Sequence, residues 1–207
     1  MLNLFLSAFI TLFVVIDPPG CAPIYAGLTT GATPEQRRAM ALRACAIAGA
    51  ILLVFALFGA ALLGALHIEL DSFRIAGGLM LFLIALDMVF EKRTRRREQR
   101  AEKVAATTEV EDVSVFPMAM PMIAGPGAIA SVMLLEGGAK GLPGSVAVLA
   151  ALAVVIVLTL LALLAAGPLM KLVGAGVEAV VTRLLGVLLA ALAAQYVIDG
   201  VRSSFGI

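Results

Sequence analysis

The sequence contains very few of the residues that enzymes use for catalysis or metal binding. Its 207 residues include one histidine, two cysteines and no tryptophan, and only 14% of them are charged. The histidine, His67, lies in a short turn, and we find no acid pair or metal-ligand cluster of recognised spacing. A nucleophile needs a base or a metal beside it to be activated. We therefore expect no enzyme activity, no cofactor and no metal site.

Further absences exclude other classes of protein. Cys21 and Cys45 lie in apolar segments without CxxC spacing, which predicts packing residues rather than a disulfide framework. No GxxxxGKS/T sequence is present, so a pump driven by nucleotide hydrolysis is not expected. The net charge of +1 gives no reason to expect a nucleic-acid partner. Residues 1–16 lack a basic n-region and a cleavage pattern, so we expect retained structure rather than a signal peptide.

Apolar residues dominate the chain instead. They make up 62% of it, with a mean hydropathy of +1.08, against roughly 45–50% in soluble domains. This composition predicts an all-α, polytopic membrane protein with six transmembrane segments. We expect two interrupted segments at 2–30 and 116–136, and continuous ones at 41–66, 73–90, 145–171 and 184–201. Thr33-Pro34 predicts the start of the helix that leads into the second segment.

The first segment is interrupted by Asp17-Pro18-Pro19-Gly20. Proline removes a backbone donor and its ring clashes one turn back, so a helix cannot pass smoothly through this sequence. Aspartate is a favoured N-cap, and proline is favoured at the first helical position. We predict that one helix ends near Ile16 and another begins near Pro18. The first amides and the positive dipole end of the second helix would then face the protein interior.

A second interruption, Phe116 to Gly127, contains Pro117, Pro121 and Pro126, and a helix is expected from Pro126 to about Glu136. Non-helical backbone at membrane depth is tolerated only where it is buried in protein or lines a polar cavity. Two such breaks in corresponding positions point to the central site of a transporter. The alternative is two proline kinks that pack against their neighbours and bind nothing.

The two interruptions indicate an internal duplication. We predict a first three-span repeat at 1–90, a charged loop at 91–112 and a second three-span repeat at 113–207. An odd number of crossings per unit inverts the second copy, giving a 3+3 inverted repeat with discontinuous first and fourth helices. The equivalent residues Arg74 and Arg183 are expected at helix starts.

The basic residues predict the orientation. Twelve of the fifteen fall in the loops after the first, third and fifth segments, and three, Arg74, Lys140 and Arg202, fall on the other side. The positive-inside rule places loop 91–112 in the cytoplasm and both termini in the periplasm. If both interrupted segments were re-entrant hairpins, the partition would be the same but the C-terminus would lie inside.

The candidate substrate-binding residues are those at the two breaks. They are Asp17, Pro18, Pro19, Gly20, Ala124, Gly125, Pro126, Gly127 and Ser131. Asp17 is also the candidate for proton or cation coupling, because an intramembrane carboxylate is expected to be functional; its alternative role is only that of a helix cap. A small zwitterion could rest its carboxylate on the amides of Gly20 or Gly127. Gln195 and Tyr196 are deep enough to hydrogen-bond across helices, while Asp87 and Asp199 are expected at the interfaces.

Several stretches resemble the MarC family of bacterial inner-membrane proteins. They are Ile16-Asp17-Pro18-Pro19-Gly20, Pro23-Ile24-Tyr25, Phe116-Pro117, Pro121-Met122-Ile123-Ala124-Gly125-Pro126-Gly127-Ala128-Ile129 and Gln195-Tyr196-Val197-Ile198-Asp199-Gly200. Pro19 departs from the leucine or isoleucine that is commoner there. The resemblance implies a six-span inner-membrane protein near the LysE-like exporters, with some relatives that transport glycine and alanine.

The resulting hypothesis is a secondary transporter or exporter of small neutral amino acids that works by alternating access. Its expected partners are that small-molecule substrate, the lipid bilayer and further copies of the chain. A non-transporting membrane scaffold and a membrane-embedded enzyme are the alternatives. A ligand that stabilises the folded protein would separate a transporter from a scaffold.

Overall fold

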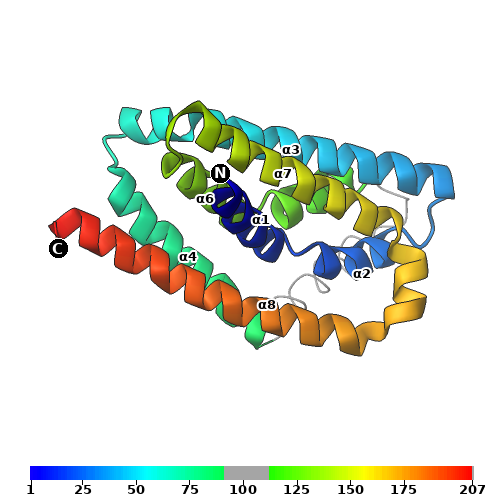
Figure 1. Cartoon of the computed structure of the whole chain (residues 1–207). Helices are drawn as coiled ribbons and strands as arrows, with labels where there is room; N and C mark the ends of the chain where they lie inside the picture. Colours follow the sequence, from blue (N-terminus) through cyan, green and yellow to red (C-terminus); the bar gives the residue numbers. More distant parts are fainter. Residues whose placement is uncertain (91–111, 207) are drawn as a thin grey trace.

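A computed structural model describes residues 1–90 and 112–206 of the chain, so the predicted loop 91–112 lies outside the described residues except for Asp112. All regular elements in the described part are helical, which confirms the all-α fold (Figure 1). The elements are α1 (Leu2–Ile16), α2 (Pro18–Leu28), α3 (Pro34–Ala65), α4 (Leu70–Val89), η1 (Ser114–Ile123), α6 (Pro126–Gly137), α7 (Gly141–Leu164) and α8 (Ala166–Phe205).

The helices have the length and composition of membrane spans. Five stretches of the described chain are long and apolar enough to cross a bilayer: α1 with α2, then α3, α4, α7 and the Val180–Phe205 part of α8. The number rises to six if η1 and α6, which are bent by 53° relative to each other, form one span. The predicted polytopic membrane protein is thereby confirmed.

The helix starts follow the local sequence. At α3, the Thr33 hydroxyl accepts a hydrogen bond from the Gln36 amide at 3.3 Å, and the Thr33 amide donates to Gln36 Oε1 at 2.8 Å. This reciprocal capping box satisfies two amides that would otherwise lack a partner, and it confirms the predicted restart at Thr33-Pro34. The Tyr25 hydroxyl donates to the carbonyl of Arg37, which ties the end of α2 to the first turns of α3.

Two boundaries in the second half differ from the predicted ones. The fifth segment was expected to reach Lys171, but α7 ends at Leu164 and α8 begins at Ala166. Pro168 thus falls in the first turn of α8, where a missing N–H has no intrahelical partner to lose. No proline follows it, and α8 continues to Phe205, with a sharp bend in its first part that Figure 1 shows. The prediction that Arg183 starts a helix is therefore wrong, because Arg183 lies inside α8.

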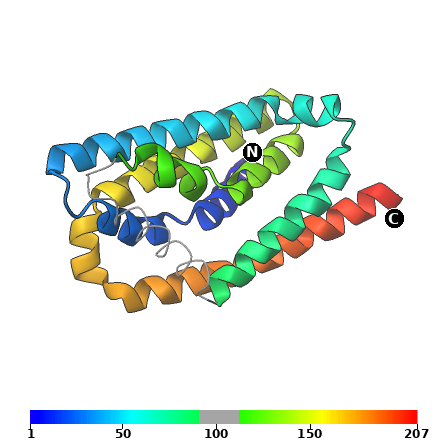
Figure 2. The same ribbon diagram turned by 180° about the vertical axis from the view of Figure 1, so that it is seen from behind.

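Helices α4 and α8 form a closely packed pair that runs antiparallel, as Figures 1 and 2 both show. Glycines allow the close approach: a Cβ at Gly78 would lie 2.9 Å from the Ala193 carbonyl oxygen, and one at Gly200 would lie 3.0 Å from that of Asp71. Small residues at helix contacts are typical of membrane bundles. Helices α3 and α7 also run in opposite directions and cover the other side of the bundle (Figure 1).

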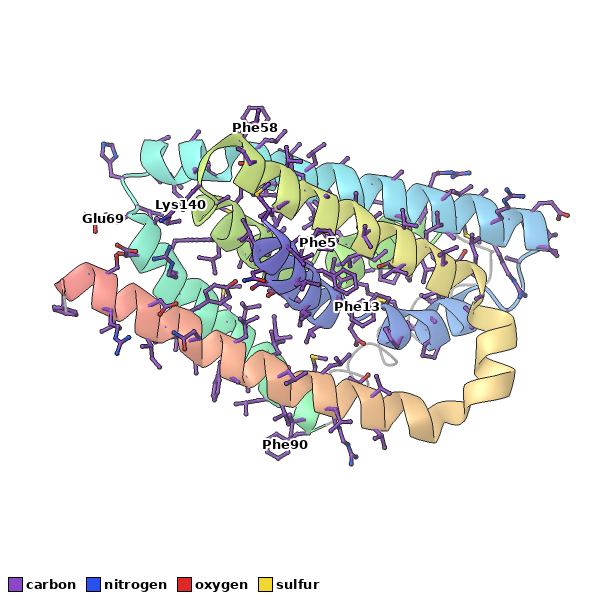
Figure 3. All side chains as sticks on the ribbon, in the orientation of Figure 1. Phe5, Phe13, Phe58, Glu69, Phe90 and Lys140 are labelled. Carbon is purple, nitrogen blue, oxygen red and sulfur yellow. The ribbon has the colours of Figure 1, made fainter. Side chains whose placement is uncertain are left out.

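The outer surface of the bundle is apolar. Phe58 of α3 and Phe90 after α4 point away from it in Figure 3, with 63% and 65% of their surface exposed. Within the bundle, Phe5, Phe9 and Phe13 stack along one side of α1, with ring centroids 6.3 and 5.7 Å apart. An apolar exterior of this kind is satisfied by lipid rather than by water.

Candidate functional site

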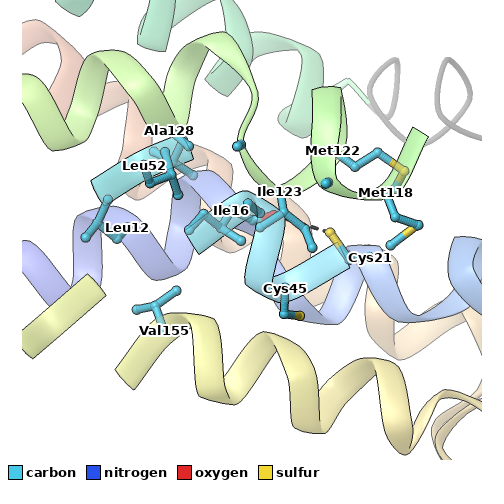
Figure 4. Close-up of a cluster of buried hydrophobic side chains, with 14 of the residues drawn as sticks. Leu12, Ile16, Cys21, Cys45, Leu52, Met118, Met122, Ile123, Ala128 and Val155 are labelled. Atoms are coloured by element: carbon cyan, nitrogen blue, oxygen red, sulfur yellow. Dashed lines mark hydrogen bonds between the residues drawn. The ribbon is translucent and has the colours of Figure 1, made fainter. Parts of the chain in front are cut away.

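The two helix breaks meet in the core of the bundle. Ile16 ends α1, Ile123 ends η1, and both side chains are fully buried. Figure 4 shows them close together, with Leu12 of α1 and Ala128 of α6 beside them. A Cβ at Gly127 would lie only 3.3 Å from Val15 Cγ1, so the start of α6 packs directly against the end of α1. Residues about 110 positions apart in the sequence thus form one site.

The first break is a single residue, Asp17, with the left-handed backbone angles φ 60° and ψ 64°. Its side chain is 1% exposed, and its Oδ1 accepts a hydrogen bond from the Gly20 amide at 3.1 Å. The predicted end at Ile16, start at Pro18 and N-cap are confirmed. A side chain at position 20 would displace this carboxylate, because a Cβ there would lie 2.2 Å from Asp17 Oδ2.

The first turn of α2 has no amide left for a substrate. Pro18 and Pro19 have no N–H, and the amide of Gly20 is bonded to Asp17. A carboxylate also occupies the place where an anion would lie. The expectation that Gly20 offers its amide to a substrate carboxylate is therefore wrong, and this break instead presents a buried acid.

The second break is longer and differently made. In η1 the bonds from the Met118 amide to the Val113 carbonyl (3.2 Å) and from the Ala124 amide to the Ala119 carbonyl (2.9 Å) span five residues, as in a π-helix. The backbone is non-helical at Phe116 and Met120, and each of these residues precedes a cis-proline.

Helix α6 begins without a side-chain cap. Its N-cap residue is Gly125, with Pro126 at the first helical position. The amides of Gly127 and Ala128 follow at the second and third positions, where no intrahelical carbonyl can reach them. The predicted helix from Pro126 to about Glu136 is confirmed, and it ends at Gly137. The uncapped amides and the helix dipole of this first turn would together favour a negative group.

Ser131 adds a hydroxyl to the same face of α6. It follows Gly127 by four residues, which places the two on one side of the helix. Its side chain is fully buried, and within the described part of the chain its Oγ makes no hydrogen bond. A buried hydroxyl without a partner costs stability. Ser131 is thus the candidate-site residue whose chemistry the fold leaves unused.

Polar contacts also cross from α1 to α8. The Thr11 hydroxyl, 1% exposed, donates to the Ser7 carbonyl at 2.8 Å. The Tyr196 side chain of α8 lies close to Thr11, and a cross-helix hydrogen bond of Tyr196 stays a prediction. Gln195 instead donates to Asp199 Oδ1 of its own helix at 2.7 Å, at an exposed position.

One residue of the site was missed by sequence reasoning. Ile84 of α4 lies over the start of α6, with its Cδ1 2.5 Å from the Cβ position of Gly127. No motif marks this isoleucine among the other apolar residues of α4, so only the packing reveals it. Within the described residues, no group of three or more histidine, cysteine or acidic side chains could hold a metal ion.

Comparison with known proteins shows what the chain is similar to. The model of a family described as "MarC family integral membrane protein" matches residues 2–205. A UPF0056 membrane protein of Methanocaldococcus jannaschii is 33% identical, with 98% of each chain covered. YvbG of Bacillus subtilis is 33% identical over 99% of this chain and 97% of its own, and YhcE of Escherichia coli is 30% identical over 95% and 91%. No solved structure matches.

Proposed function

The chain belongs to the MarC family of integral membrane proteins, and from this premise we propose that it is a secondary transporter of small neutral amino acids of the glycine or alanine type. The observation that carries the proposal is the meeting of two unlike helix breaks inside the bundle. One presents the buried carboxylate of Asp17. The other presents the uncapped amides of α6 and the hydroxyl of Ser131, which has no hydrogen-bond partner among the described residues.

The acid of Asp17 and the positive N-terminal end of α6 together suit a zwitterion. The substrate carboxylate would bind the amides of Gly127 and Ala128 and the hydroxyl of Ser131, and the ammonium group would bind Asp17. An ionised carboxylate accepts more than one hydrogen bond, so Asp17 can cap α2 and bind substrate together. Ile84 and Val15 lie against Gly127, so the space is suited to glycine or alanine rather than to a long side chain.

The arrangement of the helices supports an inverted repeat in the units 1–90 and 113–207. The third helices of the two units, α4 and α8, run in opposite directions. The second helices, α3 and α7, do the same (Figure 1). Each unit also begins with a broken helix, at Asp17 and at 124–125. Alternating access in such proteins is a rocking of one repeat against the other around a fixed site.

We place the chain in the inner membrane of a bacterium, with the loop 91–112 in the cytoplasm and both termini in the periplasm. The proposal rests on the twelve-to-three distribution of basic residues. A periplasm-active reporter fused after Ile207 tests it. Activity supports full crossings, whereas silence would favour re-entrant hairpins with an internal C-terminus.

Counterflow of labelled alanine and glycine in proteoliposomes tests the function. We expect saturable exchange by the wild type and at least a tenfold loss in Gly127→Leu, whose side chain would collide with Ile84. Gly27→Leu is the matched control, because a Cβ at Gly27 meets no atom within 4 Å. No exchange by folded, oriented wild-type protein would refute the amino-acid assignment.

Asp17→Asn tests coupling in the same assay. Asparagine caps a helix as well as aspartate does, so the break is retained while the charge is lost. We expect weaker exchange, because the substrate ammonium loses its charged partner, and the exchange that remains should no longer respond to an imposed pH or cation gradient. If the variant kept the wild-type response, Asp17 would be a cap only.

A further inference from the structure

A second polar feature lies at the far end of α6, away from the breaks. There, α3 and α6 enclose a cavity of about 240 Å³, lined by Ala56, Leu57, Ala60, Met133, Glu136 and Gly137. The space exists because the α3 wall is built largely of small side chains. The Met133 side chain lies against Gly59 of α3, because a Cβ at Gly59 would be 2.7 Å from Met133 Cγ.

The cavity contains one carboxylate. The Oε2 atom of Glu136 is buried, and it makes no hydrogen bond to any residue that the structure describes. Burying a carboxylate oxygen without a donor is costly. Two arginines pair with other acids, Arg74 with Asp71 at 2.9 Å and Arg43 with Asp112. The nearest cation along the chain, Lys140, forms no ion pair with Glu136 among the described residues. The carboxylate therefore has no hydrogen-bond donor among the described residues. A ligand with an N–H group could supply one.

The position of Glu136 along α6 places the cavity near the membrane surface. Ten residues separate it from Pro126, which corresponds to about 15 Å of helix, half of a hydrocarbon core of about 30 Å. Glu69 and Lys140 mark the same end of the bundle in Figure 3. Leu57, which is 52% exposed, forms the rim of the cavity on the lipid-facing side of α3. A ligand can thus arrive from the interface with an apolar part directed toward the lipid.

We propose that this cavity binds a primary ammonium group attached to a short apolar chain. The ammonium would donate to Glu136 Oε2, and the carbon atoms would lie against Ala56, Ala60 and Met133. The volume equals that of about eight water molecules at about 30 Å³ each, enough for a small alkylamine or for the ethanolamine head of a lipid. An α-amino acid fits poorly here, because its carboxylate is attached one carbon from the ammonium group and would lie beside Glu136. The site is therefore independent of the proposed transport site.

The test measures the thermal unfolding midpoint of the purified full chain in phosphatidylcholine nanodiscs at increasing concentrations of n-propylammonium. A ligand that binds only the folded state raises the midpoint in a concentration-dependent way, which gives a Kd. We expect Glu136→Gln to raise that Kd at least about tenfold, the loss of one charge-assisted hydrogen bond. Tetramethylammonium, which has no N–H donor, should bind the wild type at least about tenfold more weakly. Equal binding by Glu136→Gln, or equal binding of the two cations, would overturn the proposal.

Two further variants separate binding from folding. Ala60→Leu fills the cavity and leaves Glu136 in place, so it should abolish the shift. Glu69→Gln removes an exposed acid at the same end of the bundle and should leave the shift unchanged. Retained binding in Ala60→Leu, or its loss in Glu69→Gln, would contradict the proposed site.

Lipid composition identifies the source of the ammonium group. If phosphatidylethanolamine in the nanodisc weakens n-propylammonium binding relative to phosphatidylcholine, the lipid head group occupies the cavity. If the Kd is the same in both lipids, the ligand is a free amine. Either outcome supports an ammonium site, because both require n-propylammonium to bind through Glu136.

Discussion

The two helix breaks have similar sequences but opposite chemistry. Each contains proline and glycine at the start of a helix, yet Asp17 closes the first break with its own side chain, and Gly125 leaves the second one open. The first therefore presents a buried carboxyl group to the core, and the second presents amides without a side-chain cap and a positive dipole end. This difference fits the proposed binding of a molecule that carries both charges. Two breaks with the same cap would have formed a site for one sign of charge only.

The two breaks also differ in the atoms that a side chain in place of glycine would meet. The largest effect on stability is expected where those atoms belong to the backbone. A Cβ at Gly125 would lie 2.4 Å from the Pro121 carbonyl oxygen, a backbone atom that cannot turn aside. We expect Gly125→Ala to lower the free energy of unfolding by about 3 kcal/mol, the upper range for overpacking. Denaturation in mixed detergent micelles measures this. Gly64→Ala, where a Cβ meets nothing within 4 Å, is the control and should not destabilise the protein. Equal effects of the two substitutions would show that the second break tolerates a side chain.

At the first break the obstructing atom belongs to a side chain, so the expected effect is smaller. Gly20→Ala must displace the Asp17 carboxylate, whose Oδ2 lies 2.2 Å from the Cβ position. Loss of the cap should lower the free energy of unfolding by about 1–2 kcal/mol. Asp17→Ala removes the same cap, so the double variant should cost less than the sum of the two single changes. Strict additivity would mean that Gly20 acts through something other than the cap.

Ser131 should respond in the opposite direction. Because its buried Oγ has no partner among the described residues, Ser131→Ala should raise the free energy of unfolding by about 1 kcal/mol. Alanine exchange in proteoliposomes should fall about tenfold at the same time, since a hydrogen bond to the substrate carboxylate is lost. Thr159→Val is the comparison, because the equally buried Thr159 hydroxyl already donates to the Val155 carbonyl at 2.8 Å. If both variants lost stability alike, the Ser131 hydroxyl would be an ordinary structural group.

Features of the fold and of the site could be predicted from the sequence where they depend on residues close together in the chain. The break at Asp17 and the helix starts at Pro126 and at Thr33-Pro34 rest on contacts within three or four residues, and the sequence alone predicted them. The contact of Ile84 with Gly127, the approach of Tyr196 to Thr11 and the early end of α7 depend on which helices pack together. Sequence reasoning also missed that the Gly20 amide is occupied, although the N-cap role of Asp17 and the anion site at Gly20 need the same N–H.

The smallest predicted effect concerns an acid that lies before the second break instead of within it. Asp112 Oδ1 accepts from the Ser114 amide at 3.0 Å, and Asp112 pairs with Arg43 of α3. The hydroxyl and amide of Ser114 and the Arg43 guanidinium hold the pKa of Asp112 below its ordinary value of 3.8. A lowered carboxyl pKa contributes stability that is complete above the unfolded-state pKa and is lost as the pH falls through the folded-state pKa.

Asp112→Asn should therefore lower the free energy of unfolding by less than about 1 kcal/mol at pH 7, because both partners are largely exposed and salt screens them. Asparagine can still accept from the Ser114 amide, so the variant removes only the charge. The difference from the wild type should shrink below pH 3.8 and in high salt, which denaturation curves at several pH values would reveal. A difference that stayed constant at low pH would mean that Asp112 acts through its shape.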